Sequence, residues 1–219
     1  MPDDPQGQGS FEYEKNLPGH KYKSTGSDEE LGDMHLSTEN YSVALEYYEK
    51  ALQSIHLAAS VPAELVRLYI KISDCYRKKG LFREATTFLE SASSHCADND
   101  LIGKAIINSR RAIIHRLGGE VQRALKEGCA AYRVLRTSDE HKEVANNQLL
   151  IANCYFRLGK HEEAEQFYLD ALSSYRRIND KVGESFVMNN LGLFHKNACR
   201  WGRALQFLNK ALSICEEVG

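Results

Sequence analysis

The chain has 219 residues, of which 42% are hydrophobic and 26% charged, and its formal net charge is −2. This composition is that of a soluble globular protein, and a nearly neutral chain has no overall field that would attract nucleic acid or an anionic membrane. No stretch approaches the ~18 consecutive apolar residues that a membrane span needs, and the N-terminus lacks the basic start and apolar run of a secretory signal. We therefore expect no direct binding of nucleic acid or membrane.

The six cysteines indicate a reducing environment. They are scattered along the chain, and none belongs to a Cys-x-x-Cys pair. This distribution is typical of reduced thiols in the cytosol, and it offers no recognisable metal-ligand spacing. The sequence thus predicts a cytoplasmic protein without a cofactor or a bound metal.

The first 27 residues differ in composition from the rest of the chain. They contain three of the four prolines and show no apolar periodicity. Such a segment is typical of a flexible leader. From Asp28 onward only Pro62 remains, as expected when nearly all of the chain is helical.

From Asp28 to Gly219 the sequence repeats with a period close to 40 residues. When segments that begin at Leu31, Ile72, Arg111, Ile151 and Leu191 are aligned, three columns contain only small residues. The first column reads Gly32, Ser73, Ala112, Ala152, Gly192. The second column reads Ala44, Ala85, Ala124, Ala164, Ala204, with steps of 41, 39, 40 and 40 residues. The third column reads Ala51, Ala92, Ala131, Ala171, Ala211.

These columns predict pairs of closely packed helices. Alanines seven residues apart lie on one face of a helix, and a small residue twelve positions earlier lets a preceding antiparallel helix approach closely. The expected fold is all-α, a right-handed α-solenoid of five helix–turn–helix repeats at about 28–60, 61–98, 99–138, 139–179 and 180–219. Gly128 departs from a column that elsewhere holds Tyr or Leu. We expect looser packing there, or a neighbouring side chain that fills the space.

The pattern of small residue, aromatic, alanine, aromatic, alanine resembles the tetratricopeptide repeat family over residues 28–219. The resemblance is strong in "IANCYFRLGKHEEAEQFYLDAL" and in "NNLGLFHKNACRWGRALQFLNKAL". The 40-residue period is similar to that of a long-repeat subgroup, found in kinesin light chains, in polarity adaptors and in sensor arrays of bacterial regulators. The resemblance implies a non-enzymatic module for protein–protein interaction.

The last repeat stops without a polar capping element. A solenoid needs such an element at each end to cover its terminal apolar face. The sequence therefore predicts a chain truncated at its C-terminus, with further helices or another domain after Gly219. It also predicts that an uncovered end could pair with a second copy as an end-to-end homodimer.

The first helix of each repeat is expected to line a concave groove. In the second and third repeats Arg67, Lys71, Arg77 and Arg110 predict a locally basic groove, suited to an acidic segment of a partner. In the fourth and fifth repeats amide, apolar and basic side chains are interleaved. These residues are Asn146, Asn153, Phe156, Asn189, Asn190 and Lys196.

Asparagine can donate and accept hydrogen bonds at once, so these amides suit the backbone of an extended peptide. The resemblance implies the same use, and Asn153 and Asn190 match the positions of the family's backbone clamp. Leu149 stands where members that bind chaperone tails carry lysine, so a clamp for a C-terminal carboxylate is not expected.

Other interpretations of the same residues remain open. The groove residues can simply be solvated, with the asparagines bridging neighbouring helices. Alternatively, the array can be the ligand- or signal-sensing domain of a bacterial transcription regulator or a signalling ATPase or kinase. His35, His115 and His195 share a column with Tyr76 and Tyr155, which favours a half-buried aromatic position over catalysis. No phosphate-binding, nucleophile-elbow or metalloprotease motif occurs, so no enzymatic activity is expected.

Overall fold

The computed structural model describes residues 25–57 and 62–218, and this part of the chain forms ten α-helices and no strands. The helices are α1 (Thr25–Ser37), α2 (Tyr41–Leu57), α3 (Pro62–Lys78), α4 (Phe82–His95), α5 (Leu101–Leu117), α6 (Val121–Leu135), α7 (His141–Arg157), α8 (His161–Arg177), α9 (Lys181–Asn197) and α10 (Trp201–Val218). The expected leader lies outside the described residues as far as residue 24, and α1 begins within its last few residues.

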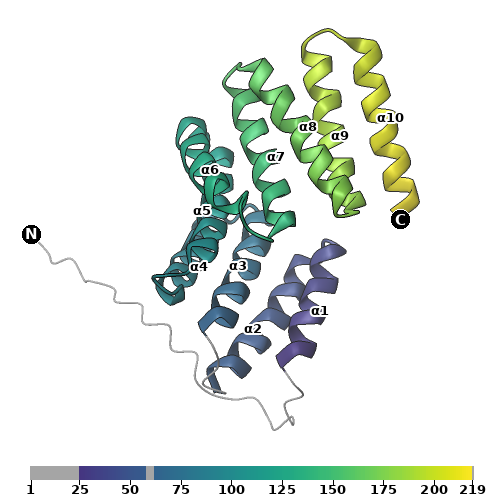
Figure 1. The fold of residues 1–219 in the computed structure, drawn as a ribbon. Coiled ribbons are helices and arrows are strands. Elements are labelled where there is room, and N and C mark those ends of the chain that lie inside the picture. The colour runs from purple at the N-terminus through teal and green to yellow at the C-terminus, as the bar shows by residue number, and fades with distance from the viewer. Residues whose placement is uncertain (1–24, 58–61, 219) are drawn as a thin grey trace, which may run out of the picture.

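The helices form five antiparallel hairpins that stack into a curved, right-handed solenoid (Figure 1). Each odd-numbered helix packs against the helix that follows it, and each even-numbered helix packs against the first helix of the next hairpin. In addition, α3 contacts α5, α5 contacts α7 and α7 contacts α9, whereas no even-numbered pair contacts to the same extent. The odd-numbered helices are therefore on the inside of the curve. The fold predicted from the repeat is confirmed.

The small-residue columns form the contacts within and between hairpins. All ten alanines of the two alanine columns are buried, with at most 7% of their surface exposed. The Ser73 hydroxyl donates a 2.8 Å hydrogen bond to the carbonyl oxygen of Ala85, which joins two of the predicted columns directly. A large side chain at either position would hold the two helices apart. Close helix approach is thus built into every repeat.

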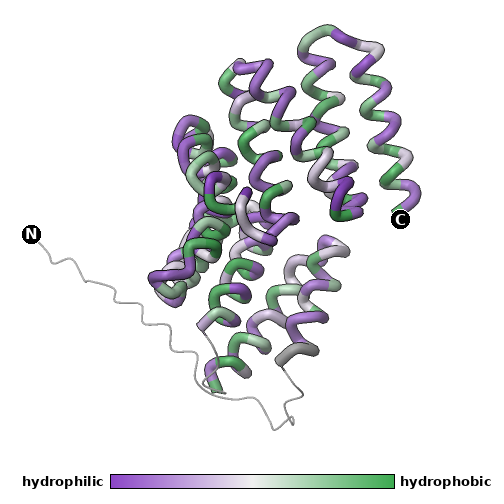
Figure 2. The backbone as a smooth tube through the Cα atoms, in the orientation of Figure 1, coloured by the Kyte–Doolittle hydropathy of each residue, from purple (hydrophilic) through white to green (hydrophobic). Residues whose placement is uncertain are grey.

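Helices α2 to α10 are amphipathic, so the core extends along the stacked hairpins, whereas α1 shows little separation of apolar and polar faces. Hydrophobic and hydrophilic residues alternate within every helix, and no helix is apolar throughout (Figure 2). None of the helices in residues 25–57 and 62–218 combines the length and hydropathy needed to span a membrane. Stability in such an array comes from contacts between neighbouring hairpins.

Gly128 is the exception in its column, and the structure shows what occupies the space. A methyl group at this position would meet Ile151 Cγ1 and Leu150 Cδ2 at 3.4 Å, an ordinary van der Waals separation. Side chains of the next inner helix therefore fill the gap that the missing Tyr or Leu leaves. Of the two outcomes expected at Gly128, the neighbouring side chain is the one found.

Gly128→Ala should stabilise the protein, whereas Gly32→Ala should destabilise it. Removing a mid-helix glycine is worth about 0.5–1 kcal/mol, and Gly128 has room for the added methyl group. The same methyl group at Gly32 would lie 2.4 Å from Cε1 of Tyr48, whose ring is fully buried. We expect overpacking there to outweigh the helical gain, by about 1–3 kcal/mol. Urea unfolding followed by circular dichroism measures the free energy of unfolding of both variants. Changes of the same sign in the two variants would contradict this account.

Candidate functional site

Four of the ten predicted site residues meet in one cavity on the inner side of the solenoid. This central cavity has a volume of about 380 Å³ and is formed by residues of α3, α5, α7, α8 and α9. Its lining is Asp74, Arg77, Lys78, Arg110, Ile113, Arg116, Asn146, Leu149, Leu150, Asn153, Tyr175 and Phe186. Repeats two to five thus each contribute to a single site. The solenoid brings together residues that are more than one hundred positions apart in the chain.

The other predicted residues lie beside the central cavity or away from it. Arg67 and Lys71 line a neighbouring cavity of about 590 Å³ on α3 and α5, which Arg110 also lines. Asn189 lines a third cavity of about 600 Å³, between the end of α1 and the α9–α10 hairpin. Asn190 and Lys196 lie on α9 but do not line these three cavities. The predicted set is therefore spread along the groove.

Phe156 packs mainly against the aromatic core rather than facing the groove. Its ring is half-buried and lies 5.8 Å, centroid to centroid, from the buried ring of Phe194 in an edge-on arrangement. It also lies 6.3 Å from the ring of His161. Such aromatic pairs stabilise the packing of neighbouring hairpins. The part of Phe156 that remains exposed is the only part that a ligand could contact.

Arg67 and Lys71 do not form a free basic surface. Arg67 Nη2 lies 2.8 Å from Glu29 Oε2, and Lys71 Nζ lies 2.7 Å from Glu29 Oε1 and 2.6 Å from Asp33 Oδ2. Burial alone would raise the pKa of Glu29, but the hydrogen bonds from Arg67 and Lys71 outweigh it, so the pKa is lowered. The acidic residues of α1 thus neutralise the cations of α3.

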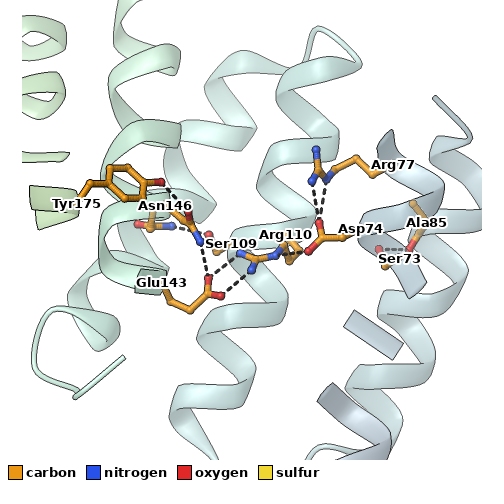
Figure 3. Close-up of polar contacts among 10 residues, drawn as sticks. Ser73, Asp74, Arg77, Ala85, Ser109, Arg110, Glu143, Asn146 and Tyr175 are labelled. Atoms are coloured by element: carbon orange, nitrogen blue, oxygen red, sulfur yellow. Dashed lines mark hydrogen bonds and ion pairs between the residues drawn. The ribbon is translucent and has the colours of Figure 1, made fainter. Parts of the chain in front are cut away.

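Arg77 and Arg110 belong to a chain of ion pairs across three inner helices (Figure 3). Asp74 accepts from both arginines, with N–O distances of 2.9 Å to Arg77 and 3.0 Å to Arg110. Arg110 also makes a two-pronged contact with Glu143, with both N–O distances at 2.7 Å. The four cations that predicted a locally basic groove therefore all have carboxylate partners, so their charges are largely offset within the protein.

Burial makes this ion-pair chain energetically important. Desolvation alone would raise the pKa of Asp74, but Arg110 and Arg77 outweigh it and lower the pKa. Desolvation would likewise lower the pKa of Arg110, whereas Asp74 and Glu143 raise it. Only 11% of the Arg110 side chain is exposed, so each charge depends on its partners rather than on water. These ion pairs hold α3, α5 and α7 in register.

The ion pairs continue into hydrogen bonds toward the fourth hairpin. The Tyr175 hydroxyl donates to Asn146 Oδ1 at 2.6 Å, and Asn146 Nδ2 lies 3.5 Å from Glu143 (Figure 3). Burial raises the pKa of Tyr175, so this hydroxyl remains a donor at neutral pH. Asn146 is therefore held by its neighbours, and its orientation in the cavity is set before any ligand arrives.

Asn153 is oriented by a buried tyrosine on the following helix. The Tyr168 hydroxyl donates to Asn153 Oδ1 at 2.8 Å, and the first hairpin contains the equivalent bond, from Tyr48 to Asp33 Oδ1 at 2.7 Å. The carbonyl oxygen of Asn153 is thus used internally. Its Nδ2 group makes no hydrogen bond within the described residues, so it is left as a donor at the central cavity.

One position between consecutive inner helices recurs four times with different chemistry. The residue just after the small-residue column corresponds, at each junction, to a residue of the next hairpin that lies two positions before the same column. The four pairs are Asp33–Lys71, Asp74–Arg110, Ile113–Leu150 and Asn153–Asn190. The first two pairs are ion pairs and the third belongs to one apolar cluster. In the fourth pair the side chain of Asn190 has no hydrogen bond within the part of the chain that is described.

Sequence reasoning missed Glu29, Glu143 and Tyr175, and it left Asp74 out of the site. The repeat contains a signal for part of this set, because Asp33 and Asp74 share a column and so do their partners Lys71 and Arg110. An acid in one column matched by a cation in the other predicts an ion pair between hairpins. Glu143 shares its column with Glu64, but the residue equivalent to Arg110 in the preceding hairpin is Glu30, so no ion pair recurs there. Tyr175 has no tyrosine counterpart in the other repeats, so only the tertiary structure reveals these two residues.

The most deeply buried cysteines and the three histidines of the repeated column occupy structural positions. Burial raises the pKa of Cys75 to about 12 and that of Cys154 to about 11, which keeps both thiols protonated and poorly nucleophilic. His35 and His115 are half-buried and His195 is buried, in agreement with the predicted aromatic position. Among the described residues no three His, Cys, Asp or Glu side chains are grouped so that they could hold a metal ion.

The outer face of α10 is apolar and exposed. Leu205 and Leu212 are 60% and 58% exposed, whereas Leu45 and Leu172, the residues equivalent to them in α2 and α8, are buried by the next hairpin. In an end-to-end homodimer that uses this end of the array, the second copy would bind to this face. That pairing stays a prediction.

Comparison with known proteins places this geometry in a family. A family model described as "Tetratricopeptide repeat" matches residues 103–177 and 143–217, which together exceed half of the chain, and a second model of the same description matches residues 29–54. The chain belongs to the tetratricopeptide repeat family. The resemblance seen in the sequence is thereby confirmed.

Relatives of this tetratricopeptide repeat chain occur in several kinds of protein. It is 25% identical over 198 residues to the Protein KINESIN LIGHT CHAIN-RELATED 3 of Arabidopsis thaliana, covering 87% of this chain and 30% of that protein. The array thus corresponds to less than a third of that relative.

Solved structures share the fold at low sequence identity. A Rap protein complexed with competence and sporulation factor superposes with a TM-score of 0.78 at 14% identity, covering 88% of this chain and 54% of that one. BtubC (BKLC) from P. vanneervenii gives a TM-score of 0.60 at 20% identity, covering 90% and 75%. A signal transduction ATPase with a tetratricopeptide repeat sensor from Pyrococcus horikoshii gives a TM-score of 0.65 at 14% identity. The match covers 87% of this chain and 29% of that one. These likenesses concern the fold.

Proposed function

We propose that this tetratricopeptide repeat array binds an extended segment of another protein along its concave groove, at the central cavity. The observation that carries the proposal is the unused amide donor of Asn153 in the central cavity, with Asn190 at the matching position of the next hairpin. At the equivalent position the first three hairpin junctions are closed by ion pairs or apolar contact, whereas these amides retain unused hydrogen-bonding groups. The fourth junction is thus the one with polar capacity left for a ligand.

The chemistry of this junction suits a peptide backbone. The free Nδ2 group of Asn153 can donate to a backbone carbonyl, and the Asn190 amide can both donate and accept. Ile113, Leu149 and Phe186 supply apolar surface beside them, and 51% of Phe186 is exposed. Amides that hold the backbone and apolar walls that receive alternate side chains are the elements of extended-peptide recognition.

The proposed role is binding without chemistry. The groove is organised by satisfied ion pairs and oriented amides, and the buried thiols of Cys75 and Cys154 behind it are protonated, so none of these groups is poised as a nucleophile or a base. We infer a non-enzymatic, cytoplasmic interaction module that belongs to a larger regulatory or scaffolding protein.

A sensor role is the second candidate. The Rap protein of similar fold is complexed with a competence and sporulation factor, and the Pyrococcus ATPase carries its tetratricopeptide repeats as a sensor. The same groove would then receive a signal molecule and act on an attached domain. A helix-turn-helix or P-loop domain in the same polypeptide would favour this candidate over a scaffold.

The proposal is tested by selecting binders and then changing Asn153. We would screen the chain against a library of randomised ten-residue peptides that are acetylated and C-terminally amidated. Asn153→Asp keeps the oxygen that accepts from Tyr168, as Asp33 does for Tyr48, but removes the amide donor. Selected peptides should bind this variant about tenfold more weakly, because one hydrogen bond to the backbone is lost.

Asn209→Asp is the matched control, since it makes the same change on exposed α10, outside the groove. It should bind the selected peptides with wild-type affinity. Failure to select any peptide, or equal affinity of Asn153→Asp and wild type, would refute the groove assignment. Circular dichroism should show unchanged helicity in both variants.

A further inference from the structure

Arg116 is the groove arginine whose charge the protein itself leaves unpaired. It lies in the last turn of α5, and its side chain lines the central cavity. Its Nε atom is buried without a hydrogen-bond partner, and within the described residues the side chain makes no ion pair. Arg77 and Arg110, which line the same cavity, are both paired with carboxylates. Arg116 therefore differs from its neighbours in kind.

The surroundings of Arg116 disfavour its charge. Burial lowers the pKa of Arg116, and the nearby guanidinium groups of Arg157 and Arg77 lower it further. Arginine stays protonated in proteins, so an unpaired guanidinium here is a cost to the free protein. An apolar side chain of similar length would fill the space without that cost. The missing partner of this guanidinium is an anion.

We propose that Arg116 binds a carboxylate of the partner segment, an aspartate or glutamate side chain that enters the central cavity. This inference rests on the proposed function, and it names one chemical requirement of the ligand. Arg116 and Asn153 line the same cavity from the neighbouring inner helices α5 and α7. A segment whose backbone is held by Asn153 can therefore direct a side chain toward Arg116.

Charge around the cavity supports an anionic group at this place only. Among the cavity-lining residues, Arg77, Asp74 and Arg110 are engaged with one another and with Glu143, so their charges offset. Lys78 is exposed at the rim, with Nζ 5.9 Å from the centroid of the Phe186 ring. Arg116 inside and Lys78 at the rim leave a local positive excess, which would attract an acidic residue to this part of the groove.

The first test uses the free protein. Arg116→Met removes an unpaired charge while keeping the apolar stem, so the thermal midpoint should rise by about 2–4 °C. Arg77→Met is the matched control: it removes a paired charge beside Asp74, and its midpoint should fall. A midpoint for Arg116→Met that falls as far as that of Arg77→Met would show that Arg116 is a structural cation and would overturn the proposal.

The second test uses the same library of acetylated, C-terminally amidated decapeptides. Wild type should enrich peptides with Asp or Glu at one fixed position, and changing that residue to Asn or Gln should weaken binding about 10- to 100-fold. Arg116→Met should still select peptides but without the acidic position. A parallel library with free C-terminal carboxylates identifies the source of the charge, since enrichment confined to it would overturn the side-chain assignment.

The two proposals fail in different ways. If wild type selects no peptide, the groove does not bind extended segments and the proposed function fails. If peptides are selected and Arg116→Met shows the same acidic preference as wild type, binding stands and the role of Arg116 is refuted. If neither wild type nor Arg116→Met enriches an acidic residue at any peptide position, the carboxylate requirement is refuted.

Discussion

Arg110→Met should lower the free energy of unfolding by about 3–5 kcal/mol at neutral pH. Arg110 is the link between Asp74 and Glu143, and its removal leaves two largely buried carboxylates facing each other without their common partner. Arg77 still pairs with Asp74, but Glu143 would retain only the distant amide of Asn146. Urea unfolding measures the loss. Helices α3, α5 and α7 should all lose protection from amide exchange, because the arginine joins all three.

Lys71→Met is the matched control for this prediction. Lys71 pairs with Asp33 at the equivalent junction one hairpin earlier, where the Asp33 side chain is 47% exposed. Its second partner, Glu29, keeps the ion pair with Arg67 in the variant. Water can therefore replace the lost partner, and the expected cost is below about 1 kcal/mol. Equal losses for the Lys71 and Arg110 variants would mean that burial does not distinguish the two junctions.

The effect of Arg110→Met should depend on pH in a defined direction. Asp74 has a lowered pKa in the folded protein, so its pairing adds stability above the unfolded pKa of about 4 and loses it as the pH falls through the folded value. The difference in stability between wild type and variant should therefore be full at pH 7 and should shrink below pH ~4. A difference that grows on acidification would contradict the assigned role.

Tyr168→Ala should destabilise the protein by about 3–5 kcal/mol. The ring is 1% exposed and packs edge-on to Phe194, with centroids 6.2 Å apart. Because contacts in a solenoid are between nearest neighbours, the loss should be concentrated in α7 to α10. Amide exchange resolved along the chain should show faster exchange there and unchanged protection in α1 to α4. A uniform loss along the array would contradict nearest-neighbour coupling.

Tyr168→Phe separates the ring from its hydroxyl. It keeps the packing and removes the hydrogen bond to Asn153, so we expect a loss of about 1 kcal/mol. The freed Asn153 amide should then lose its fixed orientation. Selected peptides should bind this variant more weakly than wild type even though the residue does not line the central cavity.

The fold could be predicted because its signal is local and repeated. Alanine at Ala124 and Ala164 is required by the close approach of two helices within one hairpin, and the same requirement returns every 40 residues or so. The site could be predicted only in part. Arg77, Arg110, Asn146 and Asn153 were placed on the inner helices by periodicity alone, and the cavity that they share confirms that placement without testing what they bind.

The electrostatics of the groove could not be predicted in the same way. Arg110 and Arg116 are both arginines on the inner face of one helix, yet the first has two carboxylate partners and the second has none among residues 25–57 and 62–218. The difference depends on which side chains of α3 and α7 come within reach. That is set by the crossing angles and offsets of three hairpins rather than by any residue in α5.

By itself the sequence determined the helical hairpins, their number and the face of each helix that is buried, because side-chain size at a fixed period dictates how closely neighbouring helices pack. Only the tertiary structure decided which charges are satisfied, which amide is held by Tyr168, and that α3 and α9 contribute to one cavity. Those outcomes depend on the curvature of the stack. Curvature sums small rotations over successive hairpins, and no single repeat encodes it.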